Sequence, residues 1–536
     1  MSLPRTAAEV LKDHVVLEIE GIDRMYLNLY VPDLQRDLGV VGFFRSNRGY
    51  PITSGALMSP MTQGFVRRIE SFAAAKGLPI VVFEKGQRKE DIARERREAL
   101  TDRPAEEGIY LVGKAQEKAR VWRTESRRNP ETGARYPWIV WSSAMVNHYY
   151  FYGVDKDFGP FFVKFCSYFP YTGKLCLNGH EYLKRQIEKR GISYEALDNG
   201  ILSCAEPSSA QEICDGLSAD KIEALARKWL RLLPHPFSRQ DRQTGYRYEV
   251  SILQAEFSLT QVLDRSLSGR AFFEDVIRQN LDLGRPDQVA LIFNRRVSRR
   301  TPSRFRTRVI TQGVTPSLHV DYKRSRIKQY HKEGRALRTE TTINDAWDFD
   351  VGKRLKNLPH LREIGFAANR RLLQIQRLAC DCALGDAAFE RIQRPTAVNG
   401  QRVPALRFGE PRTQAVLAAL VGFSLNARPF SAAELKPRLA QLLGIPLASL
   451  SQGRLSYELR RLRQRGLIER LPKTHRYHVT SFGLRAAVFY SRLHAHLFRP
   501  ALATIIPAHT PDNSRVRAAF NTLDQLLGDQ ARRLAA

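Results

Sequence analysis

The chain contains 536 residues, and its 85 lysines and arginines against 55 aspartates and glutamates give a formal net charge of +30. Hydrophobic residues make up 43% of the chain and aromatic residues 10%, which is enough for a buried core and excludes a wholly disordered basic tail. The apolar runs are far shorter than a membrane span, and six irregularly spaced cysteines do not make a disulfide framework. We therefore expect a cytoplasmic, multidomain protein without a membrane partner.

The positive charge indicates the kind of partner. With a net charge of +30, the positive side chains repel one another in a compact chain. This repulsion is tolerated most easily when a polyanion neutralises the charge. Nucleic acid is the commonest such polyanion, because contacts to its phosphates release condensed counterions. We expect DNA as the first partner, structured RNA as the second, and a location at the nucleoid. The sequence leaves the oligomeric state open.

Residues 1–123 alternate between helical and extended patterns, which predicts an N-terminal α/β domain with a small parallel or mixed sheet. Helices are expected at residues 6–13, 63–76 and 88–100, and strands at 15–30, 79–84 and 108–113. The polar, turn-rich stretch 124–136 is expected to be a loop that separates this domain from the next.

Residues 137–393 predict a central basic α+β domain with an aromatic hairpin. Asn147–Tyr171 holds eleven aromatic residues among 25, and the turn Asp155–Pro160 separates two strands within it. These rings either stack unpaired bases or form a covered core, since Phe and Tyr are strong strand formers. Further helices are expected at residues 181–190, 217–233, 269–280 and 358–379, and further strands at 307–311, 317–322, 326–330 and 336–343.

A run of arginines in this domain is a local sign of nucleic-acid binding. Arg295–Arg308 contains seven arginines and no acidic residue among fourteen positions. Charge that is clustered as well as large favours a phosphate-binding surface over a diffuse basic one. The nucleic-acid-binding residues expected here are Arg295, Arg296, Arg299, Arg300, Arg304, Arg306, Arg308 and Lys323.

The segment after this run combines the residue types that a phosphodiester reaction needs. In alternating strands, Lys328 and Tyr330 share one face. Arg338 and Glu340 share one face of the following strand, and Gly334 is expected in the turn. A tyrosine or a water attacks, a carboxylate holds a metal ion or acts as base, and cations stabilise the phosphorane. The candidate catalytic residues are Tyr330, Glu333, Glu340, Lys328 and Arg338, with Mg²⁺ or Mn²⁺ as the metal. The alternative is a hairpin that only binds phosphate.

The pattern YxKE…LRxE in this segment resembles a hairpin of the rolling-circle replication initiators of phages and plasmids. The resemblance covers about 30 residues and implies that a tyrosine nicks DNA beside a carboxylate-bound metal. No His-hydrophobe-His metal motif accompanies it at the matching place. The stretches CLNGHEY, LDLGRPD and IKQYHKEGRALRTETTIND are similar to an uncharacterised bacterial family, and that similarity implies no activity.

A second candidate site lies at the start of a predicted helix. His180 and Glu181 are the candidate metal ligands there, although a helix N-terminus also favours an acidic residue for stability alone. The phosphate-binding motif Gly-x-x-x-x-Gly-Lys-Ser/Thr and the dinucleotide motif Gly-x-Gly-x-x-Gly do not occur in the sequence. We therefore expect no ATP, NAD or haem.

Residues 405–536 predict a basic, mostly helical C-terminal domain. From residue 401 to the end there are 21 lysines and arginines and 7 acids, a net charge of 21 − 7 = +14. Ser431 and Glu434 have the spacing of a capping box. The expected elements are a helix at 432–443, a helix at 451–465, a hairpin at 467–480 and a helix at 483–497. This order resembles the winged-helix domains of bacterial transcription regulators.

The resemblance implies that the second helix enters the major groove of DNA and that the hairpin forms a wing. The leucines Leu455, Leu459 and Leu462 recur on a face suited to the core. The arginines at i, i+7 and i+11 lie close to another face. The nucleic-acid contacts expected in this domain are Arg454, Arg461 and Arg465 on the helix and Lys473 and Arg476 in the wing.

The predicted fold class is α+β with several domains: an N-terminal α/β domain, a central mixed β-rich domain with an aromatic hairpin, and a C-terminal winged-helix domain. The leading hypothesis is a nucleic-acid-binding protein of mobile-element or replication type that nicks or processes DNA with a metal ion. One alternative is a non-enzymatic winged-helix transcription regulator. Another is the RNA-binding protein component of a ribonucleoprotein.

Overall fold

The computed structural model describes residues 6–99, 107–280, 306–312, 315–378, 384–398, 400–424, 429–494 and 522. The chain forms two compact units that interleave along the sequence. We call Leu17–Val262 with Arg338–Phe366 the sheet unit, and Met1–Val16, Leu263–Leu337 and Ala367–Ala536 the terminal unit. The expected separation at 124–136 is therefore not found, because this stretch lies inside the sheet unit.

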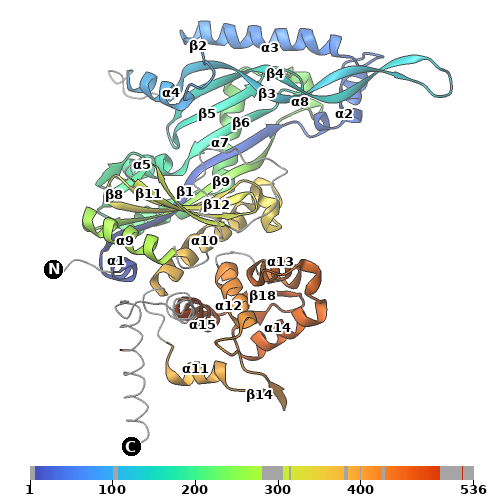
Figure 1. Cartoon of the computed structure of the whole chain (residues 1–536). Coiled ribbons are helices and arrows are strands. Elements are labelled where there is room, and N and C mark those ends of the chain that lie inside the picture. Colours follow the sequence, from blue (N-terminus) through green and yellow to red (C-terminus); the bar gives the residue numbers. More distant parts are fainter. Residues whose placement is uncertain are drawn as a thin grey trace, which may run out of the picture. The chain divides into compact units, whose positions relative to one another are not determined.

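The sheet unit is built on one mixed sheet, in which the strands follow the order β13-β9-β1-β6-β5-β4-β3-β2 (Figure 1). β1 pairs antiparallel with β6, and antiparallel pairing continues through β5 and β4 to β3, whereas the short β2 runs parallel to β3. The strands are β1 (Val15–Tyr30), β2 (Ile80–Val82), β3 (Gly108–Arg128), β4 (Arg135–Asp155), β5 (Gly159–Cys166), β6 (Gly173–Asn178), β9 (Glu249–Leu263) and β13 (Ala336–Ile343). β7 (Tyr194–Leu197) and β8 (Gly200–Cys204) form a separate hairpin.

The predicted aromatic hairpin is confirmed as β4 and β5, which pair from His148 with Cys166 to Asp155 with Gly159. Successive side chains point to opposite faces of a strand, and both faces of this hairpin are covered. On one face, Phe165 meets Phe65 of α3 (Gly55–Ala75) with ring centroids 6.0 Å apart. On the other, Tyr150 and Tyr152 pack with residues of α4 (Lys89–Glu98). The rings therefore form a core rather than a stacking platform.

Helices hold this sheet through a few buried polar contacts. Asp155, at the end of β4, accepts hydrogen bonds from Lys228 Nζ at 2.7 Å and Trp229 Nε1 at 2.9 Å, which anchors α7 (Ala219–Leu232). The other helices of the unit are α2 (Asp37–Gly42), α5 (Gly179–Lys189), α6 (Pro207–Asp215) and α8 (Arg239–Gln243).

Within the described residues, no helix is long and apolar enough to cross a lipid bilayer.

The expected loop at 124–136 is the outer end of a long hairpin. β3 and β4 stay paired from Leu111 with Tyr152 to Arg128 with Arg135, and the stretch between them turns at Gly133, where φ is +70°. We call residues 118–145 the β3–β4 arm. It projects beyond the rest of the sheet unit (Figure 1). A polar, turn-rich composition is typical of a hairpin tip as well as of a linker, which explains the error.

The terminal unit contains an antiparallel meander of β10 (Arg306–Gln312), β11 (Thr315–Tyr322) and β12 (Ser325–Lys332). Its helices include α1 (Ala7–Asp13) and α9 (Ser266–Asn280), and α10 spans Leu358–Leu378. Of the predicted arginine run, Arg306 and Arg308 lie on β10, as the extended pattern there predicted. Arg295, Arg296, Arg299, Arg300 and Arg304 lie outside the described residues.

Residues 384–494 of the terminal unit, which we call the C-terminal module, share one apolar core. Ser431 and Glu434 form the predicted capping box, and Gly444 ends the helix with φ +66°. The helices are α11 (Asp386–Gln393), α12 (Pro411–Ser424), α13 (Ala432–Leu443), α14 (Gln452–Gln464) and α15 (Ser481–Leu493). The strands are β14 (Thr396–Val398), β15 (Gln401–Val403), β16 (Phe430–Ser431), β17 (Ile468–Arg470) and β18 (Arg476–Val479), and the last three pair in the order β16-β18-β17.

Candidate functional site

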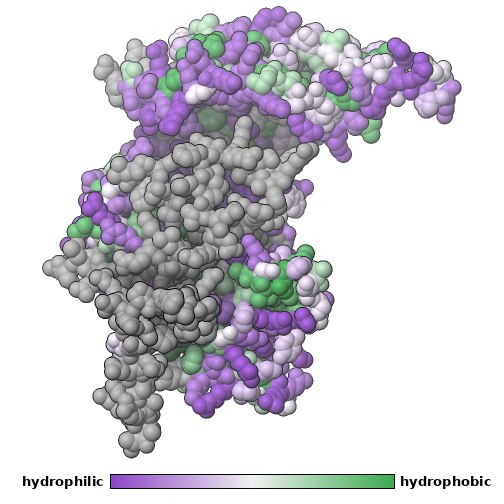
Figure 2. Space-filling model, in the orientation of Figure 1, coloured by the Kyte–Doolittle hydropathy of each residue, from purple (hydrophilic) through white to green (hydrophobic). Residues whose placement is uncertain are grey.

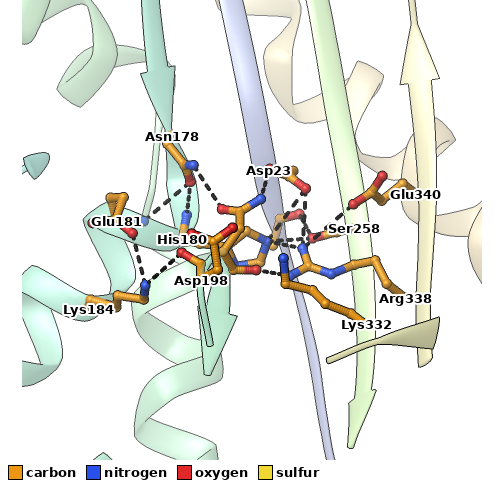
Figure 3. A network of polar contacts seen from close by, with 12 residues as sticks. Asp23, Asn178, His180, Glu181, Lys184, Asp198, Ser258, Lys332, Arg338 and Glu340 are labelled. Atoms are coloured by element: carbon orange, nitrogen blue, oxygen red, sulfur yellow. Dashed lines mark hydrogen bonds and ion pairs between the residues drawn. The ribbon is translucent and has the colours of Figure 1, made fainter. Parts of the chain in front are cut away.

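Candidate residues from distant parts of the sequence meet in a buried polar cluster of the sheet unit (Figure 3). Asp23 comes from β1, His180 from the start of α5, and Ser258 from β9, while Arg338 and Glu340 come from β13. We call these residues, with Asn199 and Asn178, the Asp23 cluster. Arg338 and Glu340 were predicted as catalytic residues and His180 as a metal ligand.

The start of α5 is shaped to place His180 against the sheet. The side chain of Asn178 caps the helix by accepting from His180 N at 2.8 Å and Glu181 N at 3.3 Å. A Cβ on Gly179 would lie 2.1 Å from the carbonyl oxygen of Ile22, so this close approach of helix and strand requires a glycine. The sequence pattern Asn-Gly-His therefore encodes the position of the imidazole.

Arg338 is the centre of the Asp23 cluster and is 0% exposed. Its NH1 group lies 3.2 Å from Asp23 Oδ2 and 2.6 Å from His180 Nε2, and its NH2 group donates to the carbonyl oxygen of Asn199. NH1 is also 3.9 Å from Glu340 Oε1. A buried guanidinium is tolerated only when it is paired and hydrogen-bonded in this way.

The charge of Asp23 is stabilised by its neighbours. Burial alone would raise the pKa of this carboxyl, but His180, Arg338 and hydrogen bonds with Glu340 and Asn199 lower it to about 2. Asn199 Nδ2 donates to Asp23 Oδ1 at 2.7 Å, and Asn178 holds Asn199 at 2.8 Å. Asp23 and Arg338 therefore form a buried ion pair within a hydrogen-bonded network.

The Asp23 cluster contains a serine, a histidine and an aspartate, but its geometry is not that of a nucleophilic triad. A triad uses both ring nitrogens of the histidine, one toward the serine and one toward the carboxylate. Here Ser258 Oγ lies 2.9 Å from His180 Nε2, and Asp23 Oδ2 approaches the same nitrogen at 4.0 Å. Arg338 NH1 also lies 2.6 Å from this nitrogen, so the serine, the carboxylate and the guanidinium all meet one ring nitrogen instead of using both. This arrangement braces β1, β9, β13 and α5 against one another.

The two predicted metal ligands point to different partners. His180 belongs to the Asp23 cluster, whereas the carboxylate of Glu181 pairs with Lys184 Nζ at 2.9 Å on the surface of α5. In the described ranges, no three His, Cys, Asp or Glu side chains gather as a metal-holding group.

The other candidate catalytic residues lie in the terminal unit. Lys328 and Tyr330 share one face of β12, as predicted, and Lys328 Nζ lies 4.2 Å from the centroid of the Tyr330 ring. Glu333 is exposed in the turn after β12, where Glu333 and Gly334 have φ of +46° and +74°. Lys323 occupies the preceding turn with φ +49°. The predicted set is therefore divided between the two units, with Arg338 and Glu340 in the sheet unit.

In the C-terminal module, the predicted leucines are in the core, but two predicted nucleic-acid contacts are wrong. Leu455, Leu459 and Leu462 are buried as expected. Arg465 is only 2% exposed, and its guanidinium donates to the carbonyl oxygens of Pro404 at 2.7 Å and Val403 at 3.2 Å, among others. Arg461 is 6% exposed and pairs with Glu458 at 3.2 Å. The chain from α11 to β15 and α12 covers this side of α14.

The solvent-facing side of α14 carries other arginines. Arg460 and Arg463 are exposed on it, and Arg454 is exposed in its first turn. The charge continues into the turn between β17 and β18, where Lys473 is exposed. Arg463, Arg470 and Lys473 line a hollow between the helix and this turn. Arg476 is held by the module itself, because its NH1 group donates to the carbonyl oxygen of Pro429 at 3.0 Å.

The sequence reasoning missed Arg460 and Arg463, and helix periodicity carried no signal for them. Around a helix of 3.6 residues per turn, Arg460 and Arg461 lie similarly far from Leu455, Leu459 and Leu462, and Arg463 and Arg465 flank these leucines on two sides. Which arginines are buried is decided by the segments that pack against α14, because Arg465 bonds to carbonyl oxygens of Val403 and Pro404 and Arg461 contacts Thr413.

One carboxyl beside the Asp23 cluster predicts a pH dependence of stability. Burial, together with the charge of Asp23, raises the pKa of Glu256 on β9 from 4.5 to about 7. In the unfolded chain Glu256 loses its proton first, so the unfolded state binds fewer protons between these values and the free energy of unfolding falls as the pH rises. The Glu256→Gln variant is expected to lack this dependence. Between pH 4.5 and 7, its free energy of unfolding is therefore expected to rise by about 1–3 kcal/mol relative to that of the native protein.

Tryptophan fluorescence in urea can measure this difference, because all five tryptophans lie in the sheet unit. Glu195→Gln is a suitable control, since Glu195 is exposed on β7. A constant stability difference between the native protein and Glu256→Gln over this pH range would contradict the burial argument.

Compared with known proteins, the chain matches no family model, no curated protein and no solved structure.

Proposed function

We propose that the protein binds nucleic acid, with duplex DNA as its first ligand, and that the C-terminal module acts as a winged helix. The order α13, α14, then the β17–β18 hairpin and α15, supports this proposal, because it matches the predicted order of helix, basic helix, wing and helix. The observation that carries the proposal is that Arg454, Arg460 and Arg463 of α14 and Lys473 of the β17–β18 turn are all exposed, and that Arg463 and Lys473 line one hollow.

The charges on this surface are available to a ligand. Arg460, Arg463 and Lys473 make no side-chain hydrogen bond or ion pair with any described part of the chain. An α-helix fits the major groove of B-DNA, which is about 12 Å wide, and a basic turn beside it reaches the phosphate backbone. The contacts of the buried Arg461 and Arg465 fix the rotation of α14 within the module. This rotation leaves Arg460 and Arg463 exposed.

The wider hypotheses all require this binding step. A mobile-element or replication protein that nicks DNA through Tyr330 with Mg²⁺ or Mn²⁺ must first dock on DNA, a transcription regulator must find an operator, and a ribonucleoprotein component must hold RNA. Binding by α14 is therefore the step to test first.

The test compares two matched double variants of the full-length protein. Arg460→Ala with Arg463→Ala is expected to weaken binding to a labelled 30-base-pair duplex by about 10–100-fold at 0.1 M salt, as measured by fluorescence anisotropy. The slope of log K against log salt concentration is expected to decrease by about 2, since each lost phosphate contact removes about 0.9.

The control is Arg407→Ala with Arg485→Ala, which removes two exposed arginines of the same module away from α14. This variant is expected to bind within about 3-fold of the native protein. Equal losses in both variants would mean that only bulk charge matters, and no duplex binding by the native protein would refute the proposal.

A further inference from the structure

We infer that the β3–β4 arm is a second DNA-binding element, a basic β-ribbon that grips the phosphates of duplex DNA. The inference rests on the proposed function, because it assigns the same ligand to a different part of the chain. Nothing in the sequence analysis pointed to it, since the outer end of the arm was predicted to be a boundary loop.

The arm carries a strong excess of positive charge. Its acidic residues are Glu125 and Glu131, so the six basic residues give a net charge of 6 − 2 = +4 over residues 118–145. Hydrophilic side chains cover most of the visible surface of this hairpin (Figure 2). The basic residues are Lys118, Arg120, Arg123, Arg127, Arg128 and Arg135, and all six are exposed.

Two like charges face each other at the outer end of the arm. Arg128 and Arg135 are directly paired across the two strands. Like charges in this position destabilise a hairpin, and neither side chain has an ion-pair partner in the described part of the chain. A phosphate group between them would convert this repulsion into attraction, so the pair indicates an anionic ligand at the tip.

The aromatic residues of the arm orient guanidinium groups. The rings of Trp122 and Trp141 stack with centroids 4.0 Å apart, and Arg120 lies 4.7 Å from the centroid of Trp141. Arg127 lies 5.5 Å from the centroid of Trp138 on the opposite face of the ribbon, and its Nε donates to Glu125 Oε1 at 2.9 Å, which leaves its two terminal amino groups for a ligand. A guanidinium that stacks on a ring keeps its N–H edges open to phosphate oxygens. Because these rings are already occupied by tryptophan or arginine, the arm is suited to phosphates rather than to stacking with unpaired bases.

The arm is held firmly at its base and has the shape of a groove-binding ribbon. Trp122 Nε1 donates to the carbonyl oxygen of Leu34 at 2.9 Å, and Thr124 Oγ1 accepts from Gly55 N at 2.6 Å. Beyond these contacts the strands remain paired to the tip. A two-stranded ribbon fits the major groove of B-DNA, whereas the major groove of A-form RNA is too narrow for it. Duplex DNA is therefore the ligand that this geometry favours.

The inference is tested with Arg128→Gln and Arg135→Gln combined in the full-length protein. Affinity for a 30-base-pair duplex is expected to fall about 10-fold at 0.1 M salt, with a salt slope smaller by about 2. The melting temperature is expected to stay the same or to rise, because the substitution removes the repulsion at the tip. The control is Lys76→Gln with Lys85→Gln, two exposed lysines of the same unit, which is expected to bind like the native protein.

Each outcome separates this inference from the proposed function. If the native protein binds the duplex and the arm variant binds it equally well, the arm inference is wrong and the role of α14 stands. If the control loses as much affinity as the arm variant, or the arm variant loses affinity only for single-stranded DNA of the same length, the ribbon assignment is also wrong. If the native protein binds no duplex DNA, both proposals fail.

Discussion

Replacing Arg338 with methionine is expected to destabilise the sheet unit by about 3–5 kcal/mol, because it leaves the buried carboxylate of Asp23 without its cation. Arg338 is fully buried, and it also bridges His180 on α5 and the carbonyl oxygen of Asn199. Because the Asp23 cluster is closed to solvent, water cannot replace these contacts without a large cost in free energy. Urea unfolding followed by tryptophan fluorescence measures this loss, since every tryptophan lies in the sheet unit.

A double variant separates the ion pair from the packing of the side chain. Asp23→Asn with Arg338→Met removes both charges, and its loss of stability is expected to be smaller than the sum of the two single losses by about 0.5–3 kcal/mol. Arg94→Met is the exposed control: Arg94 pairs with Asp91 at 2.8 Å on α4 and is expected to contribute about 0–1 kcal/mol. A loss below about 1 kcal/mol for Arg338→Met would show that the guanidinium does not stabilise the cluster, and the catalytic role predicted for it would regain weight.

Replacing Arg465 with methionine is expected to unfold the C-terminal module at a much lower urea concentration. The Arg465 guanidinium donates to the backbone carbonyl oxygens of Arg391, Arg394, Val403 and Pro404, and methionine has no donor to replace these bonds. Each carbonyl left buried without a partner costs about 1–3 kcal/mol, so a total of about 3–5 kcal/mol is expected after local rearrangement. Hydrogen exchange of α13 to α15 measures the effect, because no tryptophan lies between residues 384 and 494.

Arg463→Met is the matched control, since Arg463 is exposed in the last turn of α14, two residues before Arg465. It is expected to change the stability of the module by less than about 0.5 kcal/mol and to weaken DNA binding instead. The opposite result, in which Arg465→Met keeps native hydrogen exchange but loses DNA affinity, would restore the nucleic-acid contact that the sequence spacing predicted for Arg465.

Local elements were predictable because their signals extend over only a few residues. Alternation of apolar and polar residues identified the strands at 15–30 and 336–343 with the bounds that the structure has. The Ser431–Glu434 capping box and Gly444 located both ends of α13. The dense aromatic pattern identified the hairpin of β4 and β5, and the bias of Phe and Tyr toward strands favoured the covered core that the structure confirms.

The relation between distant segments was not predictable in the same way. Residues 124–136 have a composition that fits a linker or a hairpin tip equally well, and only the pairing of β3 with β4 distinguishes the two. β9 joins the sheet between β13 and β1 although its sequence was not singled out as a strand. The two compact units each combine separate stretches of chain, which no local pattern indicates.

By itself the sequence determined the excess of positive charge, the types of most local elements and the fact that Arg338 and Glu340 share one face of a strand. Only the tertiary structure decided which charges are used internally. Arg338 meets Asp23 across 315 positions of the chain, and Arg465 is covered by the segment from Arg391 to Pro404. The physical reason is that helix and strand periodicity acts over a few residues, whereas the burial of a charge depends on every segment that packs around it.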